Sequence, residues 1–387
     1  MQTSTEQLVQ QIHDSPMRIV LAASGGGSRA IADLLEVPGA SRTLLEAVVP
    51  YSGPAMAALL GGPPDEFCSE ATARAMAMAA FHRARRYESP NGATAGVACT
   101  ASLASDRPKR GEHRVHLAMQ TVAVTATWHL QVLKDRRSRA EEERLAGRLL
   151  LNVIAAACGV ADRLDLDLLE TECADESRME APPAWQQLLL GQTETVLVAQ
   201  TPNSGPRRGL LTKGEGTEWP LVFPGSFNPL HAGHLRMIQV AHELFGQPVA
   251  AELSILNVDK PPLDYMELAR RLAQFPASQA VFLSRAATFE EKSRLFPGAT
   301  FVVGADTLER IANPEYYDGP AARQTAIERI ASRGCRFLVF GRDLGSGFRR
   351  LGDLQLPDAL RAMCREVPPE TFHEDISSTT LRKSAGG

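Results

Sequence analysis

The pattern of hydrophobic and polar residues divides the chain into two halves, both of α/β type. In the first half, short apolar or alternating runs, which favour strands, are interspersed with segments of helical periodicity. The predicted strands are 17–23, 47–51, 93–99, 113–120 and 122–133, and the main predicted helices are 5–14, 29–35, 69–85 and 137–158. We therefore predict one compact α/β domain over residues 1–165.

In the second half, strands and helices alternate more regularly. The predicted strands are 221–223, 250–256, 280–284, 300–304 and 336–340, and the helices between them are 235–245, 265–274, 289–295 and 321–333. Such alternation indicates a Rossmann-like parallel sheet with right-handed crossovers and a ligand at the carboxyl ends of its strands. We expect this second domain to occupy residues 218–387.

Between the two halves the composition changes. Residues 170–183 are acidic, polar and proline-bearing, and residues 201–219 contain clusters of Pro, Gly, Ser and Lys. A short helix at 186–190 and a short strand at 195–199 are predicted between them. Because such clusters are typical of connecting segments, we predict that residues 166–217 link the two domains.

Length, net charge and cysteine content limit the kinds of protein and partner that we expect. A length of 387 residues suits two domains, and a formal net charge of −4 gives no reason to expect nucleic acid or an anionic membrane as a partner. No apolar run has the length of a membrane span or a signal-peptide core. The six cysteines form no Cys-x-x-Cys pair, which favours reduced thiols. We expect a cytoplasmic protein without a structural metal, which associates with copies of itself.

The most informative stretch runs from Pro224 to Leu235. It reads as a strand end, a glycine-containing turn and the start of a helix, with His231 and His234 on one face of the first helical turn. The free N–H groups of a helix N-terminus receive anions, and Gly233 removes a side chain where a ligand must come close. The stretch therefore predicts a phosphate-binding site.

Three later stretches carry matching chemistry. Gly304 and Asp306 follow an apolar strand, where a carboxylate can accept hydrogen bonds from ribose hydroxyls. Arg342 follows the last predicted strand, which places a guanidinium near the same crevice. In residues 376–382, hydroxyl side chains precede Arg382 by one helical turn, a pattern typical of a second anion site.

Together these stretches resemble the nucleotidyltransferases of the His-x-Gly-His type, specifically the nicotinate- or nicotinamide-mononucleotide adenylyltransferases. The resemblance covers about residues 218–385 and rests on Gly-Ser-Phe-Asn-Pro, His-x-Gly-His, Gly-Ala-Asp and Ile-Ser-Ser-Thr-x-x-Arg. It implies attack of a mononucleotide phosphate on the α-phosphorus of ATP, with pyrophosphate leaving and Mg²⁺ carried by the polyphosphate. Catalysis would then consist of positioning and charge stabilisation.

The resemblance also implies roles for individual residues. The catalytic residues would be His231, His234 and Arg382. The nucleotide-binding residues would be Gly225, Ser226, Phe227, Asn228, Gly304, Asp306, Arg342, Ser377, Ser378 and Thr379. Tyr316 and Tyr317 stand near the position where many bacterial members have a tryptophan that stacks on the pyridine ring. This departure leaves open whether the acceptor carries nicotinate or nicotinamide.

The N-terminal half contains Ser24 within a Gly-rich strand-to-helix turn, followed by Tyr51-Ser52 and by the helical stretch 69–76. These stretches resemble the C-terminal domain of the competence/damage-inducible protein A (CinA) family, whose active members deamidate nicotinamide mononucleotide. By resemblance, Ser24 is the nucleophile or a substrate-binding hydroxyl, and Tyr51 and Ser52 bind substrate. Met56 replaces the family's lysine, which removes a cation that would activate the serine. A domain that only binds a pyridine nucleotide, or mediates oligomerisation, is the alternative.

The two resemblances fit one pathway, because deamidation gives nicotinate mononucleotide and adenylation of that product gives a dinucleotide. We therefore expect an ATP-dependent mononucleotide adenylyltransferase of NAD synthesis, which binds ATP, Mg²⁺ and a pyridine mononucleotide. One alternative keeps the nucleotidyl transfer but changes the acceptor to phosphopantetheine or FMN, because a fold does not fix the substrate. The other is a non-catalytic nucleotide-binding scaffold.

Overall fold

A computed structural model describes residues 3–106, 110–198, 219–256, 261–343 and 347–372. The chain forms two compact units, each built around one main sheet. Unit 1 comprises Met1–Gln186 and Asp259–Glu267, and unit 2 comprises Gln187–Val258 and Leu268–Gly387. The expected mixed α/β fold with two domains is confirmed.

The sheet of unit 1 has six strands in the order β2-β1-β3-β4-β5-β6. β1 pairs in parallel with β2 and β3, and the pairs from β3 to β6 are antiparallel. The strands are β1 (Arg18–Ser24), β2 (Leu44–Val48), β3 (Thr94–Ser102), β4 (His113–Thr121), β5 (Val124–Val132) and β6 (Ala174–Glu180).

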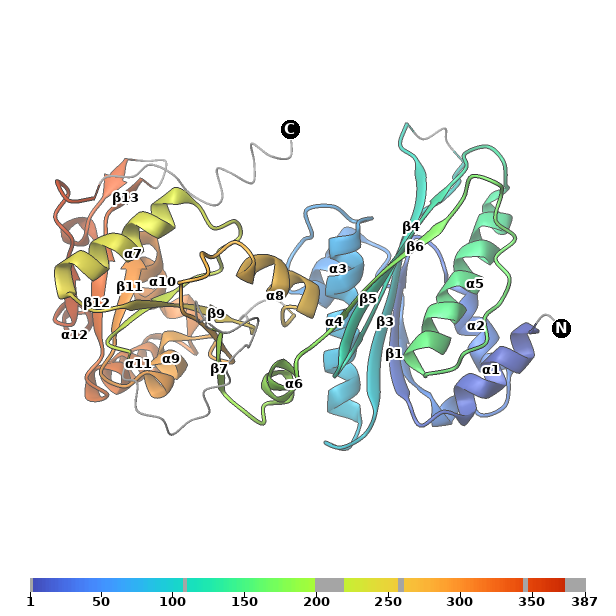
Figure 1. Cartoon of the computed structure of the whole chain (residues 1–387), viewed down its shortest axis with the longest axis horizontal. Coiled ribbons are helices and arrows are strands. Elements are labelled where there is room, and N and C mark those ends of the chain that lie inside the picture. The colour runs from blue at the N-terminus through green and yellow to red at the C-terminus, as the bar shows by residue number, and fades with distance from the viewer. Residues whose placement is uncertain (1–2, 107–109, 199–218, 257–260, 344–346, 373–387) are drawn as a thin grey trace. The chain divides into compact units, whose positions relative to one another are not determined.

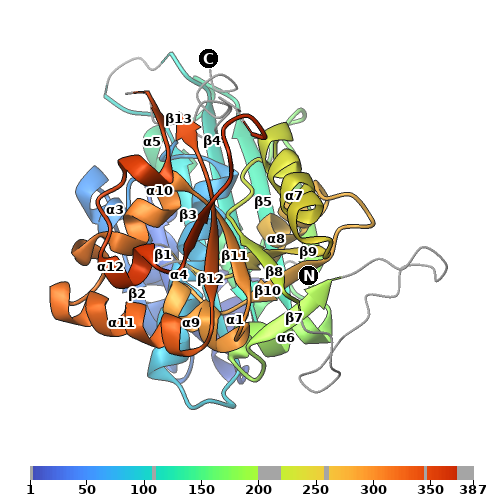
Figure 2. The same cartoon turned by 90° about the vertical axis from the view of Figure 1, so that its left-hand side faces the viewer.

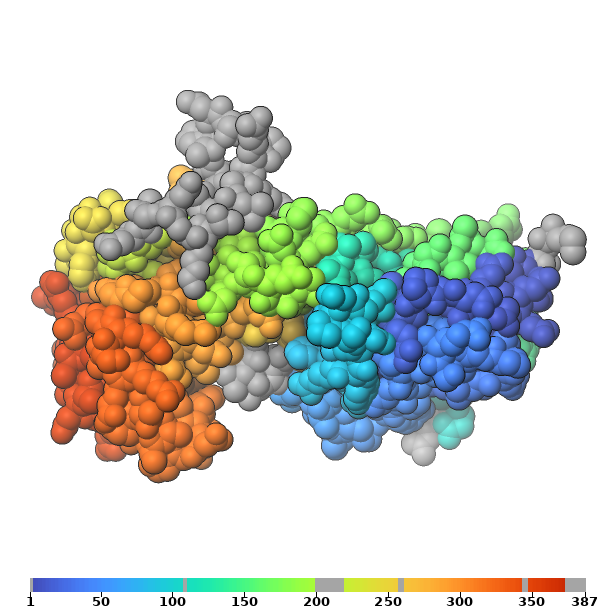
Figure 3. All heavy atoms as spheres, turned by 90° about the horizontal axis from the view of Figure 1, so that it is seen from below, coloured from blue at the N-terminus to red at the C-terminus, as the bar shows by residue number. Residues whose placement is uncertain are grey.

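Helices cover both faces of this sheet (Figure 1). One face carries α1 (Thr5–Asp14), α2 (Arg29–Glu36) and α5 (Arg139–Ala157), and the other carries α3 (Gly53–Leu60) and α4 (Glu70–Tyr87). In the space-filling view, α1 and α2 lie at the surface of their layer, in dark blue and blue (Figure 3). A Cβ on Gly96 of β3 would lie 2.1 Å from the Ala77 carbonyl oxygen, so glycine lets α4 pack directly on the sheet.

The sheet of unit 2 has seven strands in the order β15-β12-β11-β8-β9-β10-β7 (Figure 2). All its pairs are parallel except β7 with β10, so the predicted parallel sheet has one antiparallel edge strand. The strands are β7 (Thr195–Val198), β8 (Leu221–Pro224), β9 (Val249–Ser254), β10 (Val281–Ser284), β11 (Thr300–Gly304), β12 (Arg336–Phe340) and β15 (Cys364–Glu366).

The helices of unit 2 also lie on both sides of the sheet, with α7 on one side and α9 and α11 on the other (Figure 1). The longer helices are α7 (Ala232–Phe245), α8 (Tyr265–Leu272), α9 (Phe289–Leu295), α10 (Ala305–Ala312) and α11 (Pro320–Ser332). The remaining elements of the chain are α6 (Pro183–Leu190), α12 (Asp358–Arg361), β13 (Arg342–Asp343), β14 (Phe348–Arg349) and the 3₁₀ turns Ala40–Arg42, Pro314–Tyr316 and Leu351–Asp353.

A buried ion pair joins helix α9 to the sheet of unit 2. The Lys292 ammonium of α9 is 2.9 and 2.8 Å from the two carboxylate oxygens of Glu252 on β9, and 2.8 Å from the Ala286 carbonyl oxygen. The Ser284 hydroxyl also donates to Glu252. Both charged side chains are buried, so each charge needs the other to offset its loss of hydration. The backbone oxygen of Glu252 accepts from Gly225 N at 3.0 Å, which joins this pair to the turn after β8.

The segment 166–217, predicted as a link between domains, supplies regular structure to both sheets. Residues 174–180 form β6, which pairs with β5, and residues 195–198 form β7, which pairs with β10. β6 is an edge strand with mostly exposed side chains, so backbone pairing holds it and its sequence carries no apolar alternation. The part of the segment from 199 to 217 lies outside the described residues.

No helix in the described part of the chain combines the length and apolar character that crossing a membrane requires.

Candidate functional site

The turn after β8, residues 225–230, has an unusual backbone that its own side chains stabilise. Phe227 adopts a φ of 45°, in the left-handed region, and its ring is fully buried. A Cβ on Gly225 would lie 2.7 Å from that ring, so glycine is required there. The Phe227 ring also packs edge-on against His234, with 5.3 Å between ring centroids. The turn and the first turn of α7 are therefore one packed unit.

His231 and His234 stack on each other at the N-terminus of α7, with ring centroids 3.7 Å apart. The backbone N–H of His231 donates to Nδ1 of His234 at 3.3 Å. Because Nδ1 of His234 accepts, the neutral ring carries its proton on Nε2, where it can donate to a phosphate oxygen. Both ring nitrogens of His231 are buried without a hydrogen-bond partner among the described residues.

Burial keeps both imidazoles neutral in the free protein. It lowers the pKa of His231 to about 4, and the Arg342 guanidinium adds to this effect. Burial lowers the pKa of His234 to about 3, with His231 and Arg342 adding to the shift. A polyphosphate placed against these rings would favour their protonated forms and raise both pKa values.

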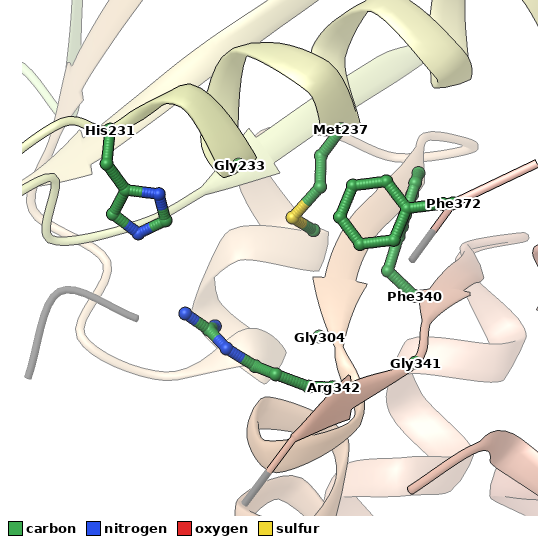
Figure 4. A pocket seen from close by; sticks show the side chains of 8 residues that line it. All are labelled: His231, Gly233, Met237, Gly304, Phe340, Gly341, Arg342 and Phe372. Carbon is green, nitrogen blue, oxygen red and sulfur yellow. The ribbon is translucent and has the colours of Figure 1, made fainter. Parts of the chain in front are cut away.

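The opposite side of the site comes from β11, α10 and the start of β13. In Figure 4 the His231 ring and the Arg342 guanidinium face the same opening, with Met237 and the rings of Phe340 and Phe372 at one end. The residues that line this pocket are His231, Gly233, Met237, Gly304, Phe340, Gly341, Arg342 and Phe372. The pocket thus joins a cationic and imidazole-rich part to an apolar part.

Gly304 permits the close approach of the groups around it. A Cβ at this position would lie 2.4 Å from Oδ1 of Asp306 and 3.5 Å from Nη1 of Arg342. Arg342 Nη1 is itself 3.5 Å from Oδ1 of Asp306, so the carboxylate predicted to meet a ribose already has a cationic partner. Gly304 is also the N-cap of α10.

The position of the pocket follows from the sheet order. β8 and β11 are neighbours, while the strand after β8 in the sequence, β9, lies on its other side. The connections from β8 and β11 therefore leave in opposite directions, which creates a crevice at their carboxyl ends. The N-termini of α7 and α10 both border it, through Gly233 and Gly304. Two sets of backbone N–H groups are available for an anion.

The structure brings some predicted residues into the pocket and leaves others outside it. His231, Gly304 and Arg342 line it, and His234 stacks beneath His231. Ser226 is exposed on the turn. Ser377, Ser378, Thr379 and Arg382 lie outside the described residues, so their predicted phosphate contacts stay predictions.

Tyr316 and Tyr317 are absent from the pocket lining, although Tyr316 is 45% exposed. The Tyr317 hydroxyl donates to the Ile311 carbonyl oxygen at 3.1 Å, which is a packing role. The sequence predicts no role in the site for Phe340 or Phe372, whose rings pack edge-on 4.9 Å apart. Phe340 ends a predicted strand, and that position was the only available signal.

Binding of ATP should take up protons at His231, because the bound polyphosphate raises the pKa that burial depresses in the free site. The affinity for ATP should therefore increase as the pH falls from 8 towards 6. We expect His231→Gln to take up fewer protons than the wild type, measured by calorimetry in buffers of different ionisation enthalpy. His242→Gln, which changes an exposed histidine at the other end of α7, is the control. Equal uptake by all three proteins would contradict this account of the imidazoles.

In unit 1, Ser24 is the last residue of β1, and its hydroxyl donates to the Pro50 carbonyl oxygen at 3.0 Å. This contact brings Ser24 next to the predicted Tyr51-Ser52 pair. The Tyr51 side chain is 74% exposed and available to a ligand. The Ser52 hydroxyl accepts from Ala55 N at 3.2 Å, so it caps α3 rather than standing free for substrate.

The turn after Ser24 needs its glycines. Gly25 has a φ of +74°, and a Cβ there would lie 2.0 Å from the Ala101 carbonyl oxygen. Two charged side chains at the start of α5 hold this turn, since Arg139 donates to the Gly25 carbonyl oxygen at 3.1 Å and Glu143 accepts from Ser28 at 2.9 Å. From the sequence, Arg139 and Glu143 are predicted only to belong to the charged first half of a helix, with no role in this turn.

Met56 stands where the resembled family has a lysine, and its side chain is 1% exposed. It belongs to an apolar cluster that includes Ala22, Ala98 and Ala118. An ammonium group in this cluster would lose its hydration without a partner. The surroundings of residue 56 are therefore adapted to methionine, and Ser24 receives no activating cation from this position.

Comparison with solved structures gives weak global similarity. A competence/damage-inducible protein, CihA, from Agrobacterium tumefaciens is 22% identical, with a TM-score of 0.31, over 40% of this chain and 94% of that chain. A competence or damage-inducible protein from Enterobacter asburiae is 18% identical, with a TM-score of 0.33, over 40% of this chain and 98% of that chain. No curated protein matches the chain significantly.

Family models match both halves. Residues 1–152 match the CinA C-terminal domain, which suggests a deamidase-related role. Residues 222–384 match the cytidylyltransferase-like family, which supports nucleotidyltransferase activity in general. The chain therefore joins a region of the CinA C-terminal type to a region of the cytidylyltransferase-like type.

Proposed function

We propose that unit 2 transfers the AMP group of ATP to nicotinate or nicotinamide mononucleotide and releases pyrophosphate. One observation carries the proposal. His231, which stacks on His234 at the N-terminus of α7, shares a pocket with Gly304, at the N-terminus of α10, and with the Arg342 guanidinium. Neutral imidazole N–H groups, backbone N–H groups and a guanidinium are donors suited to a triphosphate.

The reaction needs no nucleophile from the protein. An oxygen of the acceptor phosphate forms a bond to the α-phosphorus of ATP while the bond from that phosphorus to the bridging oxygen breaks. The electron pair of the broken bond leaves with pyrophosphate, so negative charge increases where His234 Nε2–H and Arg342 can donate. The protein thus acts by positioning the two phosphates and by stabilising this charge.

Mg²⁺ fits this arrangement as a companion of ATP. The described residues contain no group of three His, Cys, Asp or Glu side chains that could hold a metal ion. An octahedral Mg²⁺ that keeps several waters and binds polyphosphate oxygens needs no such group. When bound, the ion would offset charge on the leaving pyrophosphate, alongside Arg342.

The choice of a pyridine mononucleotide as acceptor rests on the pairing of the two units. The CinA-type match of residues 1–152 suggests a deamidase-related role for unit 1, and hydrolysis of nicotinamide mononucleotide would supply nicotinate mononucleotide. The test is to incubate the protein with ATP, Mg²⁺ and one acceptor at a time, and to separate the products. We expect a dinucleotide with a pyridine mononucleotide. A product only with FMN or phosphopantetheine would reassign the acceptor.

For unit 1 we propose hydrolytic deamidation of nicotinamide mononucleotide with Ser24 as the nucleophile. The Ser24 oxygen bonds to the amide carbon, the C–N bond breaks, and ammonia leaves with the hydroxyl proton. Water then hydrolyses the resulting ester to nicotinate mononucleotide and frees Ser24. We expect Ser24→Ala to lower ammonia release at least about a hundredfold, because the hydroxyl that attacks the amide carbon is lost. Ser89→Ala, at an exposed serine of the same unit, is the control and should keep wild-type activity. Full activity of Ser24→Ala would exclude the role of Ser24. The absence of ammonia release from the wild type would make unit 1 a binding domain.

A further inference from the structure

The side chain of Gln274 spans the 225–230 turn. Its Oε1 accepts from the backbone N–H of Leu230 at 2.9 Å, and its Nε2 donates to the Phe227 carbonyl oxygen at 3.3 Å. Gln274 follows the C-terminal end of α8 and belongs to the same unit as the turn. One amide therefore fixes both the strained residue at the centre of the turn and the residue that precedes His231.

Two arginines of α8 contact the first half of the same turn. Arg271 donates from Nη1 to the Ser226 carbonyl oxygen at 2.9 Å. Arg270 donates from Nη2 to the side-chain oxygen of Asn228. With Gln274, three side chains from one short stretch hold the turn. Gln274 is the member that uses both its donor and its acceptor on the turn's backbone.

The residue after Gln274 holds the ring of the turn. Phe275 is buried, and its ring centroid lies 4.9 Å from that of Phe227. The Phe227 ring in turn packs 5.3 Å from the ring of His234. Gln274 and Phe275 thus support, respectively, the backbone of the turn and the aromatic contact that places His234.

The turn needs this support because of its backbone. Phe227 is a non-glycine residue with a φ of 45°, a conformation that L-residues adopt at an energetic cost. Such conformations persist only where surrounding contacts hold them. The stretch 270–275 supplies these contacts.

We propose that Gln274 is a positioning residue for nucleotide binding, which holds the 225–230 turn and His234 in the geometry that receives the phosphates of ATP. This inference deepens the proposed transferase function and rests on it. Gln274 does not itself line the pocket, so it acts through Phe227, Leu230 and the adjoining histidine.

The test compares three variants of the full chain. Gln274→Leu removes both hydrogen bonds to the turn, and Gln274→Glu keeps the acceptor for Leu230 N but loses the donor to Phe227. Both variants also lose the longer contacts of Nε2 with the carbonyl oxygens of Arg270 at 3.4 Å and Arg271 at 3.5 Å. The matched control is Gln279→Leu, since Gln279 is likewise a glutamine whose side chain bonds to backbone groups. It donates to the carbonyl oxygens of Val249 at 2.8 Å and Ala280 at 2.9 Å, and none of its hydrogen bonds is to the turn. Thermal melts of all three report any general loss of folding.

We expect Gln274→Leu to lower kcat/KM for ATP by roughly ten- to a hundredfold, the scale of a small misplacement of binding groups. The kcat/KM of Gln274→Glu should lie between those of Gln274→Leu and the wild type. The kcat/KM of Gln279→Leu should stay within about twofold of the wild-type value. Wild-type kcat/KM in Gln274→Leu, or an equal loss in Gln279→Leu, would overturn the inference.

A second readout keeps the inference testable even if the wild type releases no pyrophosphate, a result that would remove the proposed function. Carbon-edited NMR titration follows the pKa of His234, which burial holds at about 3 in the wild type. If Gln274 positions the turn, the pKa of His234 should rise towards its ordinary value in Gln274→Leu and stay depressed in Gln279→Leu. An unchanged pKa in Gln274→Leu would contradict the positioning role.

Discussion

Replacing His234 with alanine should lower the kcat of nucleotidyl transfer by roughly 10²–10³, the scale for removing one preorganised donor to a developing negative charge. The geometry explains why this histidine matters. Its Nδ1 accepts the backbone N–H of His231 at 3.3 Å, which leaves Nε2–H as a donor of fixed direction. Its ring is held between His231 and Phe227, so no reorganisation is needed during the reaction.

The effect of His234→Ala should appear mainly in kcat, because the donor gains strength as charge moves onto the leaving pyrophosphate. Steady-state kinetics with varied ATP separates kcat from KM. His242→Ala, at the exposed end of the same helix, is the control and should change kcat less than about twofold. A normal kcat for His234→Ala would remove the residue from the mechanism.

Replacing Glu252 with alanine should destabilise unit 2 by about 3–5 kcal/mol, the usual cost of leaving one partner of a buried ion pair uncompensated. Glu252 is completely buried, and Lys292 is 6% exposed. Without the carboxylate, the Lys292 ammonium keeps only the Ala286 carbonyl oxygen among its described hydrogen-bond acceptors, and Ser284 loses its acceptor. Urea denaturation, followed as the shift of the transition midpoint, measures the loss.

Two further variants test whether the uncompensated charge causes the loss of stability. Glu252→Leu combined with Lys292→Met removes both charges and should recover most of the lost stability, since an apolar pair of similar size replaces the ion pair. Arg294→Ala breaks an exposed ion pair with Glu194 and should cost no more than about 1 kcal/mol. A Glu252→Ala midpoint equal to that of the wild type would show that the buried pair does not stabilise the unit.

The parts of the fold that the sequence predicts best are its buried strands and the helices between them. Strands 300–304 and 336–340 and helix 289–295 have the predicted bounds. A central parallel strand is covered on both faces, so its sequence is a continuous apolar run with sharp ends. Edge strand β6 has no such signal, because pairing with β5 places polar residues there without burying them.

The same contrast holds for the site, where residues at strand ends could be predicted and long-range polar contacts could not. The rule that ligands bind at the carboxyl ends of parallel strands predicts that His231, Gly304 and Arg342 meet, and all three line one pocket. The contacts that hold the turn were not predictable, because Gln274 and Leu230 are 44 residues apart and a single amide contributes no periodic signal. Long-range polar contacts of this kind depend on how α8 packs. Neither secondary-structure propensity nor the pattern of apolar residues encodes that packing.

The central proposal is that unit 2 transfers the AMP group of ATP to a pyridine mononucleotide, and the fate of labelled phosphates tests it most directly. The protein is incubated with Mg²⁺, nicotinate or nicotinamide mononucleotide, and ATP labelled at either the α- or the γ-phosphorus. The account predicts the α-label in the dinucleotide and the γ-label in pyrophosphate. Release of the γ-label as inorganic phosphate, or retention of both labels in ATP, would contradict it.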